Sequence, residues 1–408
     1  MLKKRAFITI PICILLSCAI CFSVYLINIK PDTSHISPAQ KVAEYAKPAV
    51  VKIVNYAVVK WQFTNPADYE VADYLNKMNN ETVVGGSGSG FMISEDGHII
   101  TNAHVVETNK MDETEIVQKA FDLLVKQMSN DFQIDPKIVE SYMLQYTLYS
   151  DVKRELKVIL PDGEKKDGQI KSYGAPVGEG KDVAVLKIAG HHFPTLKIGD
   201  SNQISLQDNV WVFGYPAAAD SDLLSEDSDK VVSITDGKIS ATDKKSNEGN
   251  PVIQISAPST HGNSGGPVIS ENGTVIGILT FRGDTVNGQE VQGFNFAVPI
   301  NTVKEFILQA GAKNKQTKTD DLYRDGLQLY WGGYYKDALT KFQQLHAHYP
   351  EHSEVKRWMA KAKEKAGDSK ILWSTYQTYF ILADIVFALI ILALLVWTFL
   401  AKKEEKTE

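Results

Sequence analysis

The chain has 408 residues, of which 44% are hydrophobic and 23% charged, and its formal net charge is −6. These fractions are those of an ordinary globular protein, and the length allows two or three domains. The negative charge excludes the basic stripe that nucleic-acid binding requires. All three cysteines, Cys13, Cys18 and Cys21, lie in the first apolar segment, so no disulfide can stabilise the rest of the chain.

The first apolar segment covers residues 6–28 and is long enough to span a bilayer as a helix. It follows a short N-terminus, residues 1–5, whose last three residues are basic. A cleaved signal peptide is the alternative, but its apolar core is normally about 7–15 residues long and ends at small residues. Here the run continues through Phe22 and Leu26. We therefore expect an uncleaved signal anchor, followed by a polar linker over residues 29–40.

Residues 41–312 are predicted to form one mainly β domain. Asp-Gly at 96–97 and 162–163 and Asn-Gly at 272–273 separate apolar runs, which is typical of antiparallel strands. Residues 61–81 read as an irregular, partly charged loop. Residues 108–152 instead carry helical periodicity and predict an inserted helical hairpin, whose second helix begins at Asp135-Pro136. The insertion is either a cap on the first lobe or a lid or partner surface near the cleft.

Three residues of this domain have the types that nucleophilic catalysis needs. Ser264 lies in the sequence Gly-Asn-Ser-Gly-Gly-Pro at 262–267, and His104 and Asp182 precede it, each beside an apolar run. A serine hydroxyl needs a base such as histidine, and a carboxylate on the other imidazole nitrogen fixes the tautomer of that base. The chain order His, Asp, Ser is that of chymotrypsin-type enzymes.

The glycines around Ser264 let the backbone adopt conformations that a side chain would forbid. The N–H groups of Gly262 and Ser264, on either side of Asn263, can then point at the place where an oxyanion would develop. We therefore predict an oxyanion hole at Gly262, Asn263 and Ser264. Loss of one such donor typically costs about 2.7–4 kcal/mol of transition-state stabilisation.

The nucleophile sequence resembles that of the HtrA/DegP family of trypsin-fold serine proteases. Further segments resemble the family in the same order, namely residues 88–91, 101–106, 198–201, 212–216 and 293–299. The resemblance covers roughly residues 40–310 and implies a two-lobed antiparallel β-barrel that hydrolyses peptide bonds through an acyl-enzyme. It also implies unfolded or damaged extracytoplasmic proteins as substrates, and a homotrimer. The separation of 78 residues between His104 and Asp182 is longer than the family pattern leads us to expect.

By the same resemblance, Pro258 and Ser259 lie near the base of the substrate pocket and Phe294 on its wall. No acidic residue stands where it would select Lys or Arg, so we predict a preference for a small or medium apolar residue before the cut. His261 is either an exposed loop residue or a group that biases the oxyanion loop with pH. No His, Cys or Asp cluster has the spacing of a metal site, so we expect neither metal nor other cofactor.

The family usually carries a PDZ domain after the protease, but residues 319–367 look helical instead. Their spacing resembles one tetratricopeptide repeat, at Gly326, Tyr330, Gly333, Tyr334, Ala338, Phe342 and Pro350. One such repeat cannot bury its hydrophobic face alone, since about three are normally needed. The segment is therefore either a spacer that packs on the protease or on another copy of itself, or a docking module for a peptide or protein partner.

Residues 378–400 form a second apolar run of bilayer length, and lysines follow it in the tail 401–408. Basic flanks at both outer ends predict a protein of the cell membrane, bacterial in type, with cytoplasmic termini and an extracytoplasmic protease domain. Asp384 lies inside the second run, where a carboxylate is costly. It either reaches interfacial water or accepts a hydrogen bond from a Ser or Thr of the first run.

The sequence thus favours a membrane-tethered serine endopeptidase. One alternative is a catalytically silent or latent scaffold that binds partners through its helical repeat, and labelling of Ser264 by a fluorophosphonate would separate the two. Another alternative is an esterase. The order His, Asp, Ser opposes the α/β-hydrolase version of that alternative, which runs Ser, Asp, His.

Overall fold

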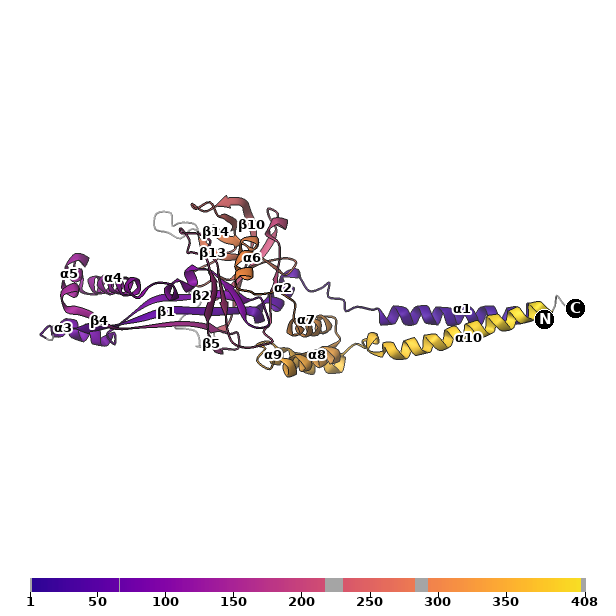
Figure 1. The fold of residues 1–408 in the computed structure, drawn as a ribbon. Helices are drawn as coiled ribbons and strands as arrows, with labels where there is room; N and C mark the ends of the chain where they lie inside the picture. The colour runs from indigo at the N-terminus through magenta and orange to yellow at the C-terminus, as the bar shows by residue number, and fades with distance from the viewer. Residues whose placement is uncertain (1, 66, 217–229, 283–292, 405–408) are drawn as a thin grey trace. The chain divides into compact units, whose positions relative to one another are not determined.

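The structure is a computed structural model that describes residues 2–65, 67–216, 230–282 and 293–404. The chain divides into two compact units. One unit contains residues 36–323 and 344–356 and holds all the strands of Figure 1. The other contains residues 1–35, 324–343 and 357–408, with the two long apolar helices.

The first lobe of the unit that holds the strands is a seven-stranded sheet in the order β5-β4-β1-β2-β3-β7-β6, in which neighbouring strands pair antiparallel. Its strands are β1 (Val50–Phe63), β2 (Glu81–Met92), β3 (His98–Thr101), β4 (Thr147–Ile159), β5 (Lys165–Asp167), β6 (Gln169–Tyr173) and β7 (Ala184–Lys187). Along the outer half of β1 buried and less buried residues alternate, as in a strand with one face on a core.

The second lobe has the order β12-β9-β10-β11-β14-β13-β8. Its strands are β8 (Lys197–Ile198), β9 (Asn209–Gly214), β10 (Ser233–Lys245), β11 (Pro251–Ile255), β12 (Pro267–Ser270), β13 (Thr274–Arg282) and β14 (Asn295–Pro299). Because β12 pairs with both β9 and β13, the sheet closes on itself as a barrel. The expected two-lobed trypsin-type architecture is therefore confirmed, although helices outside the lobes make strands a minority of the chain.

One hydrophobic core joins the two lobes. It includes Phe91 and Ile100 from the first lobe and Phe213 and Ile278 from the second, all fully buried. Helix α2 (Pro38–Ala46) and helix α6 (Ile300–Gln309) add apolar side chains to this core. A shared core of this kind keeps the two lobes at a fixed separation, which a site built from both lobes requires.

The helical insertion packs on a second hydrophobic cluster. Helices α4 (Glu113–Phe132) and α5 (Pro136–Tyr146) lie within the predicted hairpin, capped by Asp112 and Asp135, and from Thr147 the segment belongs to β4. Figure 1 shows them near one end of the long strands β1 and β4. The loop predicted at 61–81 is wrong in part, because it contains the end of β1 and helix α3 (Tyr69–Lys77). Trp61 and Leu75 of that segment are buried in the same cluster.

The segment after the two β lobes is helical, with α7 (Lys318–Trp331), α8 (Tyr335–His348) and α9 (Val355–Glu364). Gly326 allows close packing of α7 on α8, because a Cβ there would lie 2.5 Å from the Phe342 ring. The start of α7 is tied to the β lobes by Asp320, which accepts hydrogen bonds from the Thr195 amide at 2.8 Å and the Thr195 hydroxyl at 2.6 Å. The likeness to a tetratricopeptide repeat stays a prediction.

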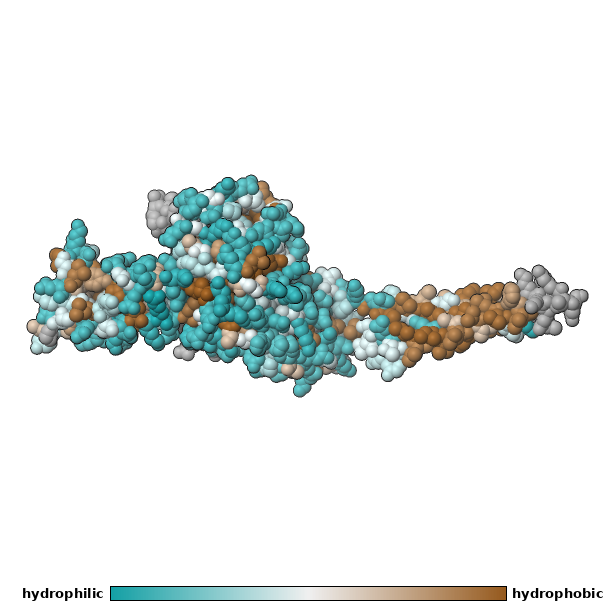
Figure 2. All heavy atoms as spheres, viewed as in Figure 1, coloured by the Kyte–Doolittle hydropathy of each residue, from teal (hydrophilic) through white to brown (hydrophobic). Residues whose placement is uncertain are grey.

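The two apolar runs form helices α1 (Leu2–Ile27) and α10 (Gln377–Glu404), both long and apolar enough to cross a membrane. Figure 2 shows them as a largely brown surface. The Ser23 hydroxyl donates to the Asp384 carboxylate, and the Thr9 and Thr398 hydroxyls lie 2.9 Å apart. Of the two interpretations of Asp384, the structure contains the hydrogen bond across helices. The last four residues of the predicted tail lie outside the described residues.

Candidate active site

His104 and Asp182 are brought together by neighbouring strands. Strands β3 and β7 pair antiparallel, with Thr101 opposite Ala184. His104 follows β3 by three residues at the start of the 3₁₀-helix η2 (His104–Asn109), and Asp182 precedes β7 by two residues. Antiparallel pairing places the end of one strand beside the start of the next, so two residues far apart in sequence become neighbours.

Asp182 holds the His104 imidazole in one orientation. His104 Nδ1 lies 2.8 Å from Asp182 Oδ2, and the His104 amide donates to Asp182 Oδ1 at 3.0 Å. Asp182 is only 3% exposed. The Thr280 hydroxyl also donates to Oδ2, so the carboxylate is held by three donors. This arrangement fixes the His104 tautomer and leaves Nε2 as the atom that can accept a proton.

The surroundings of His104 change its basicity. Burial lowers the pKa of the imidazole, but the hydrogen bond and charge of Asp182 and the charge of Glu107 outweigh burial and raise that pKa above its ordinary value. A raised pKa makes the imidazole a stronger base, with the consequence that it also protonates at a less acidic pH.

Ser264 lies in the loop between β11 and β12, on the second lobe. Its hydroxyl donates to the carbonyl of Thr280 at 3.1 Å. Among the described residues, no hydrogen bond joins the Ser264 hydroxyl to His104. Catalytic hydrogen bonds are often formed only once substrate is bound, so this geometry does not remove Ser264 as a candidate nucleophile.

Ser89 on β2 fixes the loop that carries Ser264 to the first lobe. We call this loop, which joins β11 to β12, the nucleophile loop. Its hydroxyl donates to the Gly262 carbonyl at 2.7 Å and accepts from the Tyr215 amide at 2.9 Å, and its own amide donates to the Ser264 carbonyl at 2.8 Å. Gly265 has φ +85°, and a Cβ there would lie 2.1 Å from the Ser89 carbonyl oxygen. Only glycine satisfies both conditions, which explains why that residue type follows the serine.

The amides of the loop separate into two groups. The Asn263 amide donates to the Thr260 carbonyl at 3.2 Å, the Gly265 amide to Leu279 at 2.8 Å and the Gly266 amide to Asn263 at 3.0 Å. Within the described chain, no hydrogen bond to another protein group involves the amides of Gly262 and Ser264. These two N–H groups therefore remain available to an oxyanion, whereas the Asn263 amide is already used inside the loop.

The predicted pocket residues flank two neighbouring strands, with Pro258 and Ser259 after β11 and Phe294 directly before β14. The Ser259 hydroxyl is buried and donates to Asn295 Oδ1 at 2.6 Å, and Pro258 is exposed with its carbonyl accepting from the Thr235 hydroxyl at 2.8 Å. Phe294 is 50% exposed. These contacts do not define a closed pocket among the described residues, so this assignment remains a prediction.

Sequence reasoning missed Thr280 and the structural role of Ser89. Thr280 touches both halves of the site, since its hydroxyl binds Asp182 and its carbonyl binds Ser264. A polar residue near the end of the apolar run 275–279 was an available signal for Thr280. Ser89 stands between two glycines, which signalled close backbone approach but not its hydrogen-bond partners.

Among the described residues, no group of three or more His, Cys, Asp or Glu side chains could hold a metal ion. The His192 ring instead packs 4.1 Å from that of His348, centroid to centroid. His261 is exposed in the nucleophile loop.

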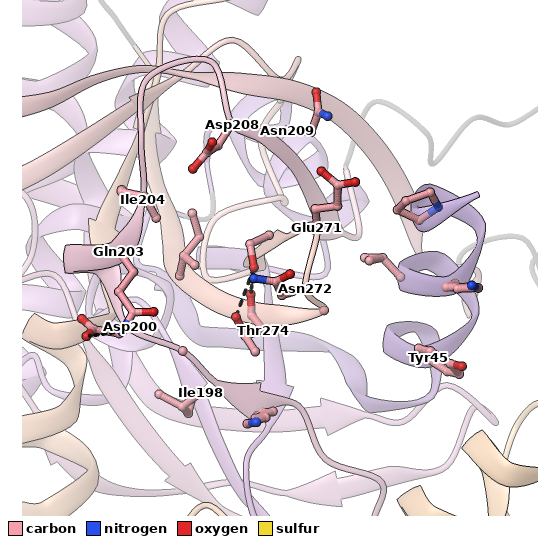
Figure 3. Close-up of a pocket in the computed structure, with 18 of the residues that line it drawn as sticks. Tyr45, Ile198, Asp200, Gln203, Ile204, Asp208, Asn209, Glu271, Asn272 and Thr274 are labelled. Carbon is pink, nitrogen blue, oxygen red and sulfur yellow. Dashed lines mark hydrogen bonds between the residues drawn. The ribbon is translucent and has the colours of Figure 1, made fainter. Parts of the chain in front are cut away.

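A separate hollow lies between α2 and the turn that joins β12 to β13. It has a volume of about 1000 Å³ and a mixed lining that includes Tyr45, Asp200, Asp208 and Glu271 (Figure 3). Part of the polar lining is already engaged, since Asp200 accepts from the Asn301 side chain at 2.7 Å. None of the predicted catalytic or pocket residues lines this hollow.

Comparison with known proteins agrees with the geometry. A family model for the trypsin-like peptidase domain matches residues 88–278. The serine protease HTRA1B of Danio rerio is 26% identical over 261 residues, which cover 62% of this chain and 41% of that protein. A protein of Halomonas elongata named "Probable periplasmic serine endoprotease DegP-like" is 32% identical over 220 residues, or 53% of this chain and 34% of the relative.

A solved structure of the HtrA-type protease AlgW with a decapeptide matches at a TM-score of 0.43 and 23% identity, covering 67% of each chain. This chain spans about two-fifths of the length of the first curated relatives, with 41% for HTRA1B. The chain therefore carries a trypsin-like peptidase domain, and its relatives are serine proteases of the HtrA type.

Proposed function

We propose that the protein is a membrane-tethered serine endopeptidase. Ser264 attacks the peptide carbonyl while His104 takes its proton, and the amides of Gly262 and Ser264 stabilise the oxyanion that develops. His104 then protonates the leaving amine, and water hydrolyses the acyl-enzyme with His104 again as base. Asp182 orients His104 and stabilises the imidazolium, without itself taking the proton.

The observation that carries this proposal is the contact between His104 and Asp182. A 3% exposed carboxylate that holds both the amide and Nδ1 of one histidine, at 3.0 and 2.8 Å, leaves Nε2 free for proton transfer. The serine loop is the second support, because two of its amides have no partner within the described protein.

Ser264 needs only a side-chain rotation to leave the Thr280 carbonyl. A neutral hydrogen bond of this kind contributes about 0.5–1.5 kcal/mol net, which is small beside the barrier that an enzyme lowers. The same contact is the observation that favours the alternative of a silent or latent scaffold. In this geometry the Ser264 hydroxyl is hydrogen-bonded to Thr280 and not to His104, its candidate base. Substrate binding that rotates Ser264 toward His104 would reconcile the contact with catalysis.

The expected substrates are unfolded or damaged extracytoplasmic polypeptides, cut after small or medium apolar residues. Support comes from a relative named as a periplasmic endoprotease and from the two helices that are long and apolar enough to cross a membrane. In this proposal both helices lie in the cell membrane, both termini are cytoplasmic and the protease domain is extracytoplasmic. A homotrimer is the assembly that the family resemblance suggests, and the helical module is proposed to bind a protein partner.

The test is cleavage of unfolded casein by the full-length protein in detergent micelles, with Ser264→Ala as the matched control. Cleavage that disappears in the variant supports the proposal, whereas equal cleavage by both proteins assigns the activity to a contaminant. If neither protein cleaves casein, a fluorophosphonate probe decides. Labelling of Ser264 identifies a latent enzyme, and failure to label a folded protein favours the scaffold.

A further inference from the structure

Glu107 lies one 3₁₀ turn after His104. Both belong to η2, and residues three apart in a 3₁₀-helix lie on the same face. Glu107 is partly buried, with 32% of its side chain exposed, so its charge is screened less than that of a fully exposed carboxylate. It is therefore a negative charge held close to the candidate base.

Lys119, on the inserted helix α4, is the counter-ion of Glu107. Its Nζ lies 3.5 Å from Glu107 Oε1 and 3.7 Å from Glu115 Oε1 on its own helix. Apolar packing holds α4 in place. Ile116 and Ala120, on either side of Lys119, are fully buried in the second hydrophobic cluster, on which the insertion packs. The position of this ammonium group is thus set by the packing of the insertion.

We propose that Glu107 is a positioning residue that tunes His104 electrostatically, and that Lys119 couples this tuning to the helical insertion. The proposal rests on the proposed function, because it deepens the role of His104 in that reaction. It also gives the insertion a role beyond that of a cap. When α4 is packed as described, Lys119 partly neutralises Glu107, and displacement of α4 would leave the Glu107 charge acting alone on His104.

Other charged and titratable groups among the described residues also lie near His104. Asp182 contacts its Nδ1 from the segment before β7, and both Asp182 and Glu107 favour the charged imidazole, which raises the pKa of His104 against the opposing effect of burial. Tyr173 on β6 stays neutral, because burial and nearby carboxylates including Glu107 raise its pKa to about 12. Lys110 at the end of η2 lies over the Tyr173 ring, 5.5 Å from its centroid.

Two substitutions with opposite electrostatic signs test the proposal. Glu107→Gln removes a negative charge, so we expect the acid limb of the kcat/KM profile to move to lower pH. Lys119→Met removes the counter-ion, so the limb moves to higher pH. On the acid limb each change alters the rate about twofold relative to the plateau, the effect typical of a partly exposed charge pair. Lys119→Arg should restore the wild-type profile.

Lys126→Met is the matched control, because Lys126 lies on the same helix seven residues further along and is exposed. It removes the same charge and should leave the acid limb in place. A structural role for Glu107 or Lys119 would lower activity at every pH without moving the limb. The proposal is overturned if neither substitution moves the limb, if both move it in one direction, or if Lys126→Met moves it as far as Lys119→Met.

A readout without catalysis keeps this inference separate from the proposed function. The His104 imidazole is titrated by NMR in Ser264→Ala protein with labelled histidine, and the His104 signal is assigned by its loss in His104→Ala. The same opposite shifts are expected for Glu107→Gln and Lys119→Met. If the protein cleaves nothing but the shifts occur, the proposed function fails and the coupling stands; if the enzyme is active but the titration is unmoved, the coupling fails alone.

Discussion

Ser23 on α1 donates a hydrogen bond to the carboxylate of Asp384 on α10, across 361 residues of sequence. Near the other ends of the same helices the hydroxyls of Thr9 and Thr398 lie 2.9 Å apart, and the Arg5 guanidinium lies 4.8 Å from the centroid of the Trp397 ring. Apolar packing against a lipid tail is worth about as much as packing against a leucine, so polar pairs of this kind select which helix faces which.

Replacement of Asp384 by leucine should loosen this helix pair in the membrane setting proposed for it. Thr9→Cys and Thr398→Cys, in a chain whose three native cysteines are serines, place a reporter disulfide between α1 and α10. An interhelical hydrogen bond is worth about 0.6 kcal/mol, so the yield of the disulfide under mild oxidation should fall about two- to threefold in Asp384→Leu. Asp384→Asn keeps an acceptor for Ser23 and is the control. Equal disulfide yields in the double-cysteine parent, Asp384→Leu and Asp384→Asn would count against a role of the Ser23–Asp384 hydrogen bond.

Thr280→Val should reduce kcat with little change in KM. The substitution keeps the shape of the side chain and the backbone carbonyl that Ser264 contacts, but removes one of the three donors to the Asp182 carboxylate. A hydrogen bond to a charged group contributes about 1.5–3 kcal/mol, so a loss of roughly ten- to hundredfold in kcat is expected. Thr274→Val, at the far end of the same strand, is the control, and an unaltered kcat in Thr280→Val would refute this role.

Activity should fall as the pH drops through the raised pKa of His104. The reaction needs the neutral imidazole, so the acid limb of kcat/KM should centre above the ordinary histidine value of about 6.5. For folding the sign is opposite: the raised pKa contributes stability below the unfolded pKa, and this contribution is lost as pH rises through the folded pKa. Steady-state kinetics between pH 5 and about 9 measure the limb, and a midpoint at or below about 6.5 would contradict the expectation.

Asp320→Ala should detach the start of α7 from the protease lobes. The carboxylate is 7% exposed and accepts from the amides and hydroxyls of Thr195 and Thr317, at distances of 2.6–3.0 Å. Removal takes the Asp320 carboxylate away from both amides and both hydroxyls, although the Thr195 hydroxyl also reaches the Lys315 carbonyl at 3.5 Å. The substitution should cost about 2–4 kcal/mol of local stability. Faster limited proteolysis near residues 310–320 would report it, while Asp321→Ala, which removes an exposed carboxylate, should cleave as the wild type does.

Much of the site could be predicted from local sequence, because His104, Asp182 and Ser264 each stand in a short motif beside an apolar run. The turn at Asn272-Gly273 likewise joins β12 to β13 as its residue types predict. The contacts of Thr280 could not be predicted, since they depend on the register of β13 against the barrel.

The helical segments show the same division. The periodicity within 108–152 is strong enough to indicate α4 and α5, whereas α3 has only nine residues and its burial depends on contacts with distant strands. The partner of Asp384 was open for a similar reason, because sequence alone does not give the relative rotation of two apolar helices. The rotamer of Ser264 is set by a carbonyl sixteen residues away and leaves no trace in its own motif.

The close approach between Gly265 and Ser89 has an evolutionary consequence. A Cβ at 265 would overlap the Ser89 carbonyl oxygen whether or not the protein cleaves anything, so selection for folding alone retains that glycine. The hydroxyl of Ser264 and the imidazole of His104 are under no such steric requirement and can drift once catalysis is no longer selected. In proteins that descend from this fold, the glycine would therefore persist with or without activity. Only the serine and the histidine would indicate that catalysis is still under selection.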